Sequence, residues 1–288
     1  MMAIKILGAG DEAALETFLL LHRHASMFLR ANARRGGLVD RGGRYQGTYA
    51  AAVEDDRIVG VAAHWGNGII SVQAPGAASE VVRAAVRESG RRVNGINGPW
   101  AHAVAAREAL GLEEAPMRLL SREVLYALDL SDLVVPDALA SGRVRCRRPD
   151  RTDLSELTTW RTTYRMELEG YEAGPELRAS ARQDVEHLNA EGRDFVLVAG
   201  DDAGRRLAYS AFNAALPDVV QVGGVFTPPE LRNRGYARAV VAGSLLRARA
   251  EDVRQAILFT GEGNVSARRA YEKLGFVPVG DYGLLGFV

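Results

Sequence analysis

Short stretches of alternating apolar and polar residues are separated by turn residues and by longer segments whose apolar positions recur every three to four residues. The alternation predicts strands, and the longer spacing predicts helices. In the first 130 residues the predicted strands are 4–6, 47–53, 58–65, 68–73, 93–96 and 121–130. The predicted helices follow Asp11 and cover 79–88 and 101–110, with Gly111 ending the last of them.

The same pattern restarts after residue 142. Strands are predicted at 144–147, 194–199, 206–214, 219–226 and 255–260, with a final extended segment at 277–288. Helices are predicted at 150–160, 180–191, 235–251 and 265–274, and the Asp-Asp-Ala-Gly at 201–204 predicts a hairpin turn. Pro136 and Ser141-Gly142 mark residues 132–142 as a linker between domains at 1–131 and 143–288.

The two halves repeat one order of elements. The segment DDRIVGVAAHWGNGIISVQAP parallels GRRLAYSAFNAALPDVVQVGGVFTPP, and INGPWAHAVAAREALGL parallels LFTGEGNVSARRAYEKLGF. Such repetition indicates two copies of one α/β unit. After its strand the first copy has Gly-Ala-Ala-Ser-Glu, whereas the second has an arginine-rich turn, so only the second copy is expected to bind a phosphate.

Composition excludes several classes of protein. Hydrophobic residues make up 47% and charged residues 25%, and 36 basic residues balance 36 acidic ones, so no global charge attracts nucleic acid or an anionic membrane. The single Cys146 excludes an intramolecular disulfide and a cysteine-based zinc site. No secretory segment is visible, and the uncharged stretch 59–79 is broken by Pro75 and glycines. We therefore expect a cytoplasmic protein with no membrane or nucleic-acid partner.

Metal chemistry is not expected either. The five histidines are scattered, and His22 and His24 are two positions apart on a predicted helix, where their side chains do not face each other. A helical pair of metal ligands needs a spacing of three or four residues. The sequence therefore predicts no metal.

The stretch Gln221–Ala237, QVGGVFTPPELRNRGYA, carries the first candidate chemistry. A strand ending in Val225-Phe226-Thr227 leads through a double-proline turn into the start of a long helix. Unpaired N–H groups and the positive end of the macrodipole make a helix start suitable for an anion. The predicted pyrophosphate-binding residues are Arg232, Asn233, Arg234, Gly235, Tyr236 and Ala237. Taken alone, the same segment is equally well explained as a surface turn.

A second pair of residues lies near the C-terminus. Asn264 and Tyr271 are seven positions apart on a predicted helix, so their side chains share one face about 10 Å apart along the axis. One side chain could bind a ligand amide while the other reaches its reactive end. The alternative is that Asn264 caps the helix and Tyr271 packs with its hydroxyl at the surface.

Together the two motifs, Arg-x-x-Gly-x-Ala and Asn-x-x-Ala-x-x-x-Tyr-x-x-x-Gly-Phe, resemble the GNAT (Gcn5-related N-acetyltransferase) superfamily. The matching residues are Arg232, Gly235, Ala237, Asn264, Ala267, Tyr271, Gly275 and Phe276. The resemblance is strong over 219–276 and weak over 1–130. It implies an α/β (α+β) fold of two tandem GNAT-like units, each with a mixed, mostly antiparallel sheet flanked by helices. It further implies a bacterial branch whose N-terminal copy is degenerate.

The resemblance also implies an activity, transfer of an acetyl group from acetyl-CoA to an amine by direct attack in a ternary complex. The pantetheine arm would run along Val225, Phe226 and Thr227, on a strand that separates from 255–260, and Gly223-Gly224 suits a bulge there. A backbone N–H near Val225 or Phe226 would hold the thioester oxygen, and Tyr271 would protonate the thiolate. Asn264 would contact the pantetheine. The acceptor, a small-molecule or peptide amine, would be selected by loops at 161–174.

No general base is evident, because the strand at 219–224 carries no acid; Glu262, Asp218 and Glu167 are the remaining carboxylates of interest. Two rival functions stay open, a non-catalytic acyl-CoA-binding sensor or interaction module and a nucleotide-binding protein. The sequence is compatible with a monomer or a homodimer.

Overall fold

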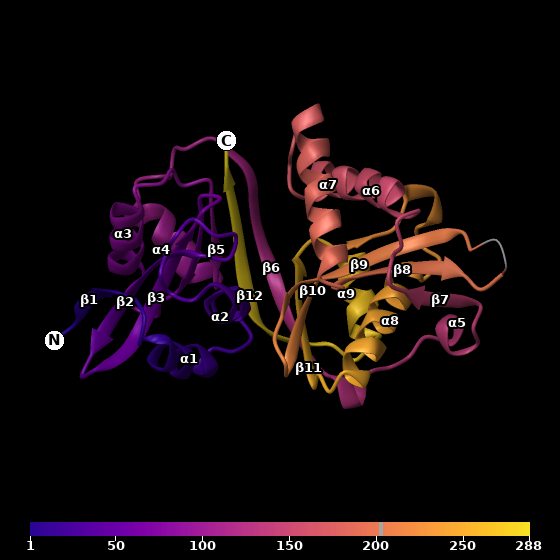
Figure 1. Ribbon diagram of the computed structural model, residues 1–288, viewed down its shortest axis with the longest axis horizontal. Coiled ribbons are helices and arrows are strands. Elements are labelled where there is room, and N and C mark those ends of the chain that lie inside the picture. The colour runs from indigo at the N-terminus through magenta and orange to yellow at the C-terminus, as the bar shows by residue number, and fades with distance from the viewer. Residues whose placement is uncertain (202–203) are drawn as a thin grey trace. The chain divides into compact units, whose positions relative to one another are not determined.

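The computed structural model describes residues 1–201 and 204–288. They divide into two compact units: the first comprises residues 1–125 and 279–288, and the second comprises residues 126–278. Both units repeat one element order of strand, two helices, three strands, helix, strand, helix and strand. Two tandem α/β units with mostly antiparallel sheets were predicted from the repeat, and the structure confirms them (Figure 1).

The first unit is built on a sheet in the order β1-β2-β3-β4-β5-β12-β6. Neighbours from β1 to β4 are antiparallel, β4 and β5 are parallel, and β12 is antiparallel to β5. The strands are β1 (Ala3–Ile6), β2 (Gly47–Glu54), β3 (Arg57–Trp65), β4 (Ile69–Gln73), β5 (Gly95–Gly98), β6 (Met117–Asp129) and β12 (Val277–Phe287). The helices are α1 (Glu12–Leu21), α2 (Met27–Gly36), α3 (Ala78–Ser89) and α4 (Trp100–Ala109).

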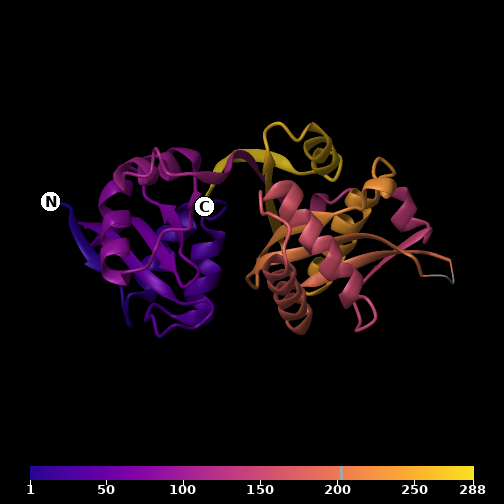
Figure 2. The ribbon, with the colours of Figure 1, turned by 90° about the horizontal axis from the view of Figure 1, so that it is seen from above.

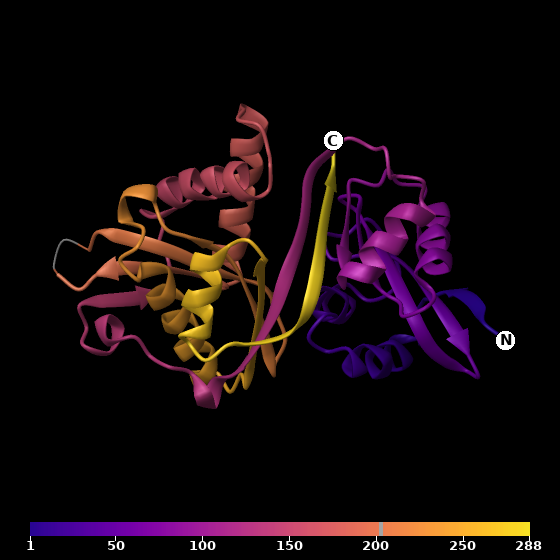
Figure 3. The same ribbon diagram turned by 180° about the vertical axis from the view of Figure 1, so that it is seen from behind.

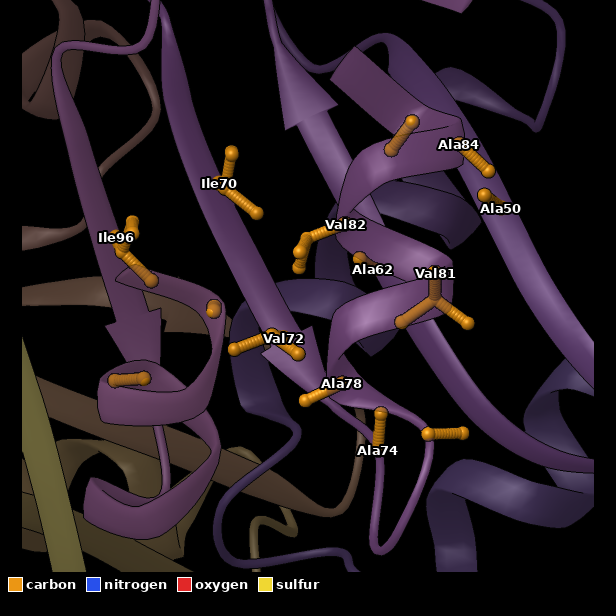
Figure 4. Packing of buried hydrophobic residues seen from close by; sticks show 14 of the residues in the cluster. Ala50, Ala62, Ile70, Val72, Ala74, Ala78, Val81, Val82, Ala84 and Ile96 are labelled. Atoms are coloured by element: carbon orange, nitrogen blue, oxygen red, sulfur yellow. The ribbon is translucent and has the colours of Figure 1, made fainter. Parts of the chain in front are cut away.

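Two hydrophobic cores cover the two faces of this sheet. On one face, α3 turns Val82 toward Ile70 and Val72 of β4 (Figure 4), and Val81 belongs to the same cluster. These side chains are at most 1% exposed, and each buried valine or isoleucine contributes roughly 1.5–3 kcal/mol. On the other face α1 and α2 pack on β2 and β3. Tightly packed helices on both faces leave the degenerate copy a complete fold of its own.

The second unit places β11, β10, β9, β8 and β7 in that order, antiparallel except for the parallel pair β10–β11. Its strands are β7 (Val144–Arg147), β8 (Asp194–Ala199), β9 (Arg206–Ala215), β10 (Val219–Phe226) and β11 (Gln255–Gly261). Its helices are α5 (Asp137–Ala140), α6 (Leu154–Leu168), α7 (Pro175–Ala190), α8 (Tyr236–Ala250) and α9 (Val265–Glu272), with 3₁₀ turns η1 (Leu130–Asp132) and η2 (Pro229–Leu231). Helices α6 and α7 pack on one face and α8 on the other (Figure 2).

The last strand of the chain belongs to the sheet of the first unit. From Val279 onward β12 lies in that unit, where residues 283–286 pair with 95–98 of β5 and β12 runs beside β6 (Figure 3). Conversely, residues 126–129 of β6 belong to the second unit. The compact units therefore differ from the predicted domains 1–131 and 143–288, whose limits stay a prediction about independent folding. Within the predicted linker the structure has α5.

Several predicted elements had the wrong extent. α6 continues to Leu168, so much of the acceptor loop expected at 161–174 is helical. Its threonines disfavour a helix by propensity, but Thr158 and Thr162 donate their hydroxyls to the carbonyls four residues earlier, which removes their competition with the backbone. α2 was not predicted, and α1 ends at Leu21, so His22 and His24 lie in a turn and not on a helix. Of the hairpin expected at 201–204, Asp202 and Ala203 lie outside the described residues.

Within the described ranges no helix combines the length and the apolarity needed to span a bilayer. In the same residues, no three His, Cys, Asp or Glu side chains lie where they could hold a metal ion together. Cys146 is packed against Gly243 of α8, and burial raises the pKa of its thiol to about 12, so it is inert at neutral pH.

Candidate active site

β10 and β11 are paired only over their first residues. The parallel register runs from Val219↔Gln255 to Gln221↔Ile257, but β10 continues to Phe226 and β11 continues to Gly261. Strands that pair at one end and not at the other leave backbone groups of the separated part available to a ligand. The separation expected between these two strands is therefore present at their C-terminal ends.

A bulge in β10 lies within the separated part. The register with β9 shifts between Gly223 and Phe226, and Gly224 adopts φ +60°, a conformation that favours glycine. A β carbon on Gly223 would lie 2.0 Å from the side-chain amide of Asn213, which would have to move. The predicted bulge at Gly223-Gly224 is confirmed. It shifts the pairing with β9 by one residue, so that Phe226 lies opposite Tyr209.

The segment between β10 and α8, residues 227–235, is braced by Arg232. Its Nε donates to the carbonyl of Thr227 at 3.0 Å, its Nη2 lies 2.7 Å from Glu167, and its guanidinium lies 5.8 Å from the centre of the Phe226 ring. We had expected this arginine to supply charge to an anion. The contacts show that it also fixes the shape of the β10–α8 loop and ties it to α6.

The start of α8 exposes several N–H groups. Asn233 (φ +64°) and Gly235 (φ +79°) turn the chain into the helix, and Gly235 has no side chain to cap it. Within the described part of the chain, the N–H groups from Gly235 to Arg238 have no acceptor, and the first turn of α8 carries no acid. Such a helix start attracts anions.

Two further arginines flank these N–H groups. Arg234 donates to the carbonyl of Glu230 at 3.2 Å. The Nη2 of Arg238 lies 3.8 Å from the position of a β carbon on Gly235, beside the uncapped N–H groups. The predicted residues Arg232, Asn233, Arg234, Gly235, Tyr236 and Ala237 thus lie in one continuous turn, whose N–H groups and arginines suit an anion. Sequence reasoning missed Arg238, although its place one residue after the Gly-x-Ala motif could have indicated it.

Asn264 and Tyr271 occupy the two ends of α9. The Oδ1 of Asn264 accepts the N–H of Ala267 at 3.1 Å, so this side chain caps the helix, which was the structural alternative drawn from the sequence. Tyr271 is 8% exposed, and its ring meets that of Phe276 edge-on at 6.1 Å. The tyrosine is therefore held in a fixed position, not on the open surface.

Comparison with known proteins gives a family match within the second unit. Residues 155–276 match the acetyltransferase (GNAT) family, and this segment covers β8 to β11, the β10–α8 loop and α9. We call the second unit the GNAT domain because of this match. The match supports an acetyltransferase, as the motifs predicted.

Solved structures extend the likeness to both units. A Drosophila protein matches 99% of this chain over 98% of its own, with a TM-score of 0.68 and 12% identity. A second match is a tandem GNAT protein from the clavulanic acid biosynthesis pathway, solved without acetyl-CoA. The match covers 99% of this chain and 97% of that protein, with a TM-score of 0.56 and 16% identity. A third match, to a GCN5-related N-acetyltransferase from Sphaerobacter thermophilus, covers 99% of this chain and 94% of that protein, with a TM-score of 0.60 and 14% identity. At these identities the likeness is one of fold, a tandem GNAT fold; no curated protein matches in sequence.

The carboxylates considered as bases of the GNAT domain lie in three different places. Asp218 precedes β10, about 25 Å of strand away from the open end. Glu167 is paired with Arg232. Glu262 directly follows β11, and since β10 and β11 are parallel it lies at the same edge as the end of β10. Position therefore favours Glu262 among the three.

Sequence reasoning missed a charged cluster on the α6–α7 side of the GNAT domain. The cluster consists of Arg161 and Arg165 of α6, Glu169 at its end, Asp184 of α7 and Tyr209 of β9. A β carbon on Gly224 would lie 3.6 Å from Nη1 of Arg161 and 3.8 Å from the Tyr209 ring. Arg161 and Tyr209 thus adjoin the bulge. The i, i+4 arginines on a helix were the available signal, but nothing local connects them with Tyr209.

Proposed function

We propose that the GNAT domain transfers an acetyl group from acetyl-CoA to an amine. The observation that carries this proposal is the separation of β10 from β11 directly beside an uncapped, arginine-flanked helix start. An extended thiol arm with a diphosphate at its far end needs both features, an unpaired strand edge for its amides and an anion site at a helix N-terminus. The comparisons support the acetyltransferase class, and the donor and mechanism are our inference.

In this proposal each part of the donor has its own contacts. The diphosphate lies on the N–H groups of residues 234–238, with Arg234 and Arg238 beside it. The pantetheine amides pair with the backbone of Val225, Phe226 and Thr227, past the bulge. Asn264 caps α9 and presents its remaining amide group toward the same arm. No metal takes part.

The reaction follows from this placement. The amine attacks the thioester carbonyl, whose oxygen becomes negative and is stabilised by a backbone N–H of Val225 or Phe226. The C–S bond then breaks, and Tyr271 donates its proton to the departing thiolate. The attacking nitrogen loses its proton to Glu262, directly or through water. Both substrates are bound together, and no covalent intermediate is needed; the one thiol, Cys146, is partly buried against α8, and its raised pKa keeps it protonated.

Replacing Tyr271 by phenylalanine tests the assignment. The change removes the hydroxyl and keeps the packing on Phe276, so we expect kcat for amine acetylation to fall by about 100-fold or more while the Kd for acetyl-CoA stays within twofold. The measurement is thiol release from acetyl-CoA with a panel of amines. Tyr49→Phe, which removes a hydroxyl from the core of the first unit, is the matched control and should leave kcat unchanged.

A second candidate function is a non-catalytic acyl-CoA sensor or interaction module. Two observations favour it: β10 carries no carboxylate, and Tyr271 is 8% exposed. The sensor predicts tight CoA binding, no acetylation of any amine and no effect of Tyr271→Phe. A nucleotide-binding protein would instead bind ATP or NAD more tightly than CoA, which direct binding measurements distinguish.

The acceptor in this proposal is a small-molecule or peptide amine. The balanced charge of the chain gives no reason to invoke a nucleic acid. We further propose a cytoplasmic enzyme that works as a monomer or a homodimer.

A further inference from the structure

Two buried donors adjoin the bulge of β10 from the α6–α7 side. They are the guanidinium of Arg161 and the hydroxyl of Tyr209. Nη1 of Arg161 lies 3.6 Å, and ring carbon Cε1 of Tyr209 lies 3.8 Å, from the position that a β carbon on Gly224 would occupy. Tyr209 pairs with Phe226 across β9 and β10, and Trp160 of α6 lies 6.0 Å from Phe226. These side chains therefore form one wall at the end of β10, where the acetyl group would be presented.

The carboxylates near this wall are bound mainly to a different arginine. Asp184 accepts from Nη2 of Arg165 at 2.8 Å, and Arg165 also donates to Ser180 at 2.9 Å. Arg161 reaches the same Asp184 oxygen only at 3.4 Å and Glu169 only at 3.7 Å. Charge-assisted hydrogen bonds are normally 2.7–2.9 Å long. The two carboxylates thus stabilise the charge of Arg161, but they do not occupy all of its hydrogen-bond donors at short distance.

Both groups have donor capacity that the protein leaves unused. In the part of the chain that the structure describes, neither Nε of Arg161 nor the hydroxyl of Tyr209 has a hydrogen-bond partner, and both atoms are buried. Tyr209 is 4% exposed, and burial raises its pKa well above the ordinary value, so its hydroxyl keeps the proton and acts as a donor. Buried donors are almost always paired in native proteins. Unpaired donors on two residues that both adjoin Gly224 therefore indicate a missing acceptor group.

We propose that Arg161 and Tyr209 bind a carboxylate of the acceptor, so that the enzyme acetylates amines that carry a carboxylate, such as amino acids. This inference rests on the proposed acetyl transfer at the same site. A planar guanidinium next to a hydroxyl matches the two oxygens of a carboxylate. A polycationic acceptor is disfavoured because Asp184 and Glu169, the acids at this wall, are already shared by two arginines.

Matched pairs of amines test the proposal. Phenylalanine is compared with phenethylamine, and 4-aminobutyrate with propylamine, each pair differing by the carboxylate. We expect the carboxylate member to be favoured by about 10- to 100-fold in kcat/KM, the range of a charge-assisted hydrogen bond. Equal values within both pairs, or a preference for the uncharged members, would overturn the inference.

Two variants test whether Arg161 and Tyr209 cause the preference for amines that carry a carboxylate. Arg161→Lys keeps the charge but removes the fork, and Tyr209→Phe keeps the ring and removes the donor; each should reduce the preference ratio about fivefold or more. KM for acetyl-CoA should not change. Arg182→Gln, an exposed α7 arginine paired with Glu186, is the control and should leave the ratio unaltered. A rise in KM for acetyl-CoA with an unchanged ratio would show that the donors serve the cofactor, which contradicts the inference.

Failure of the acetyl-transfer proposal can be recognised separately. If no amine is acetylated, calorimetric titration of the same pairs into the protein–CoA complex decides the matter. Tighter binding of the carboxylate member that is lost in Tyr209→Phe supports the wall even in a non-catalytic protein. Equal affinity, or no binding of either member, contradicts it.

Discussion

The two units share an order of elements but differ most where the fourth strand, β4 or β10, is followed by a helix. In the first unit four residues, 74–77, join β4 to α3, whereas in the second unit nine residues, 227–235, join β10 to α8. The first loop has no arginine and is followed by Glu80 in the first turn of α3, while three arginines and no first-turn acid surround the start of α8. One helix start repels an anion, and the other attracts it.

The paired strands also differ in how far they stay together. A β carbon on Gly98 of β5 would lie 2.2 Å from the carbonyl oxygen of Val72, so β4 and β5 remain in contact to their ends. His102 of α4 then closes this edge by accepting the N–H of Ala74 at 3.3 Å. β10 and β11 separate after Gln221 instead. In the second unit the backbone groups at this edge are available to a ligand, whereas the corresponding groups of the first unit make contacts within the protein.

The next helix completes the contrast. Aligning Leu110-Gly111 with Leu274-Gly275 sets Trp100 opposite Asn264 and Arg107 opposite Tyr271. Arg107 donates to the carbonyl of Leu112 and so serves its own helix end. The first unit thus retains the fold and its hydrophobic cores, although the residues at the positions of Asn264 and Tyr271 are different. Fold and site are separable properties here.

Substitution of the loop glycines should break the comparison most strongly. Gly235→Glu places a negative charge at the start of α8 and should lower CoA affinity by more than about 100-fold. Gly76→Glu makes the same change in the β4–α3 loop, at a similar backbone conformation (φ +74° against +79°) and in open space, and should leave CoA affinity unchanged.

Both substitutions put a side chain at positive φ and should cost a similar roughly 1–2 kcal/mol of stability. Calorimetric titration with CoA gives the affinities, and thermal unfolding checks that both variants fold. Unchanged affinity in Gly235→Glu, or an equal loss in Gly76→Glu, would contradict a site confined to the second unit.

The geometry of the turn at residues 232–237 could be predicted from the sequence because the turn is continuous, and its binding of an anion stays a prediction. Residues 232–237 lie side by side in the chain, and a strand, a turn and a helix start suffice to bring their N–H groups together. The bulge at Gly224 was predicted for the same reason, since two adjacent glycines in a strand have a local meaning.

Features that depend on distant segments could not be predicted. Arg161 and Tyr209 come from α6 and β9, and their approach to Gly224 depends on the packing of a helix whose threonine-rich second half does not look helical. The place of β12 in the first unit's sheet likewise depends on pairing with β5, a strand that lies far away in the sequence. Local propensity contains no information about which edge is chosen.

A buried carboxyl gives the second unit a pH dependence that the first lacks at this place. Asp194 opens β8 and is fully buried, whereas Gly47 opens the corresponding strand β2. Burial raises the pKa of Asp194 to about 7, against the weaker lowering influences of Asn189 and Arg148. In the unfolded chain the group ionises near pH 4.

Between these values the folded state holds a proton that the unfolded state has lost, so the stability of the second unit should fall as pH rises from about 4 to 7. Asp194→Asn keeps the acceptor for Asn189 and removes the titration, and its advantage over the natural protein should grow by roughly 2.5 kcal/mol between pH 5 and pH 7.5. Urea unfolding at pH 5 and pH 7.5 measures this. Parallel pH profiles for the two proteins would show that Asp194 does not titrate in this range.

The smallest effect is expected from opening the closed edge of the first unit. Burial lowers the pKa of His102, so the ring is neutral at pH 7 and accepts the N–H of Ala74. His102→Ala should cost about 1 kcal/mol of stability, the value of one hydrogen bond. It should not create a CoA site, because the short β4–α3 loop and Glu80 still oppose a diphosphate. Combining His102→Ala with Gly235→Glu isolates the first unit, since any CoA binding that returns in the double variant must come from there. Restored binding would mean that His102 alone keeps the first unit closed, and that loop length and arginines do not distinguish the two units.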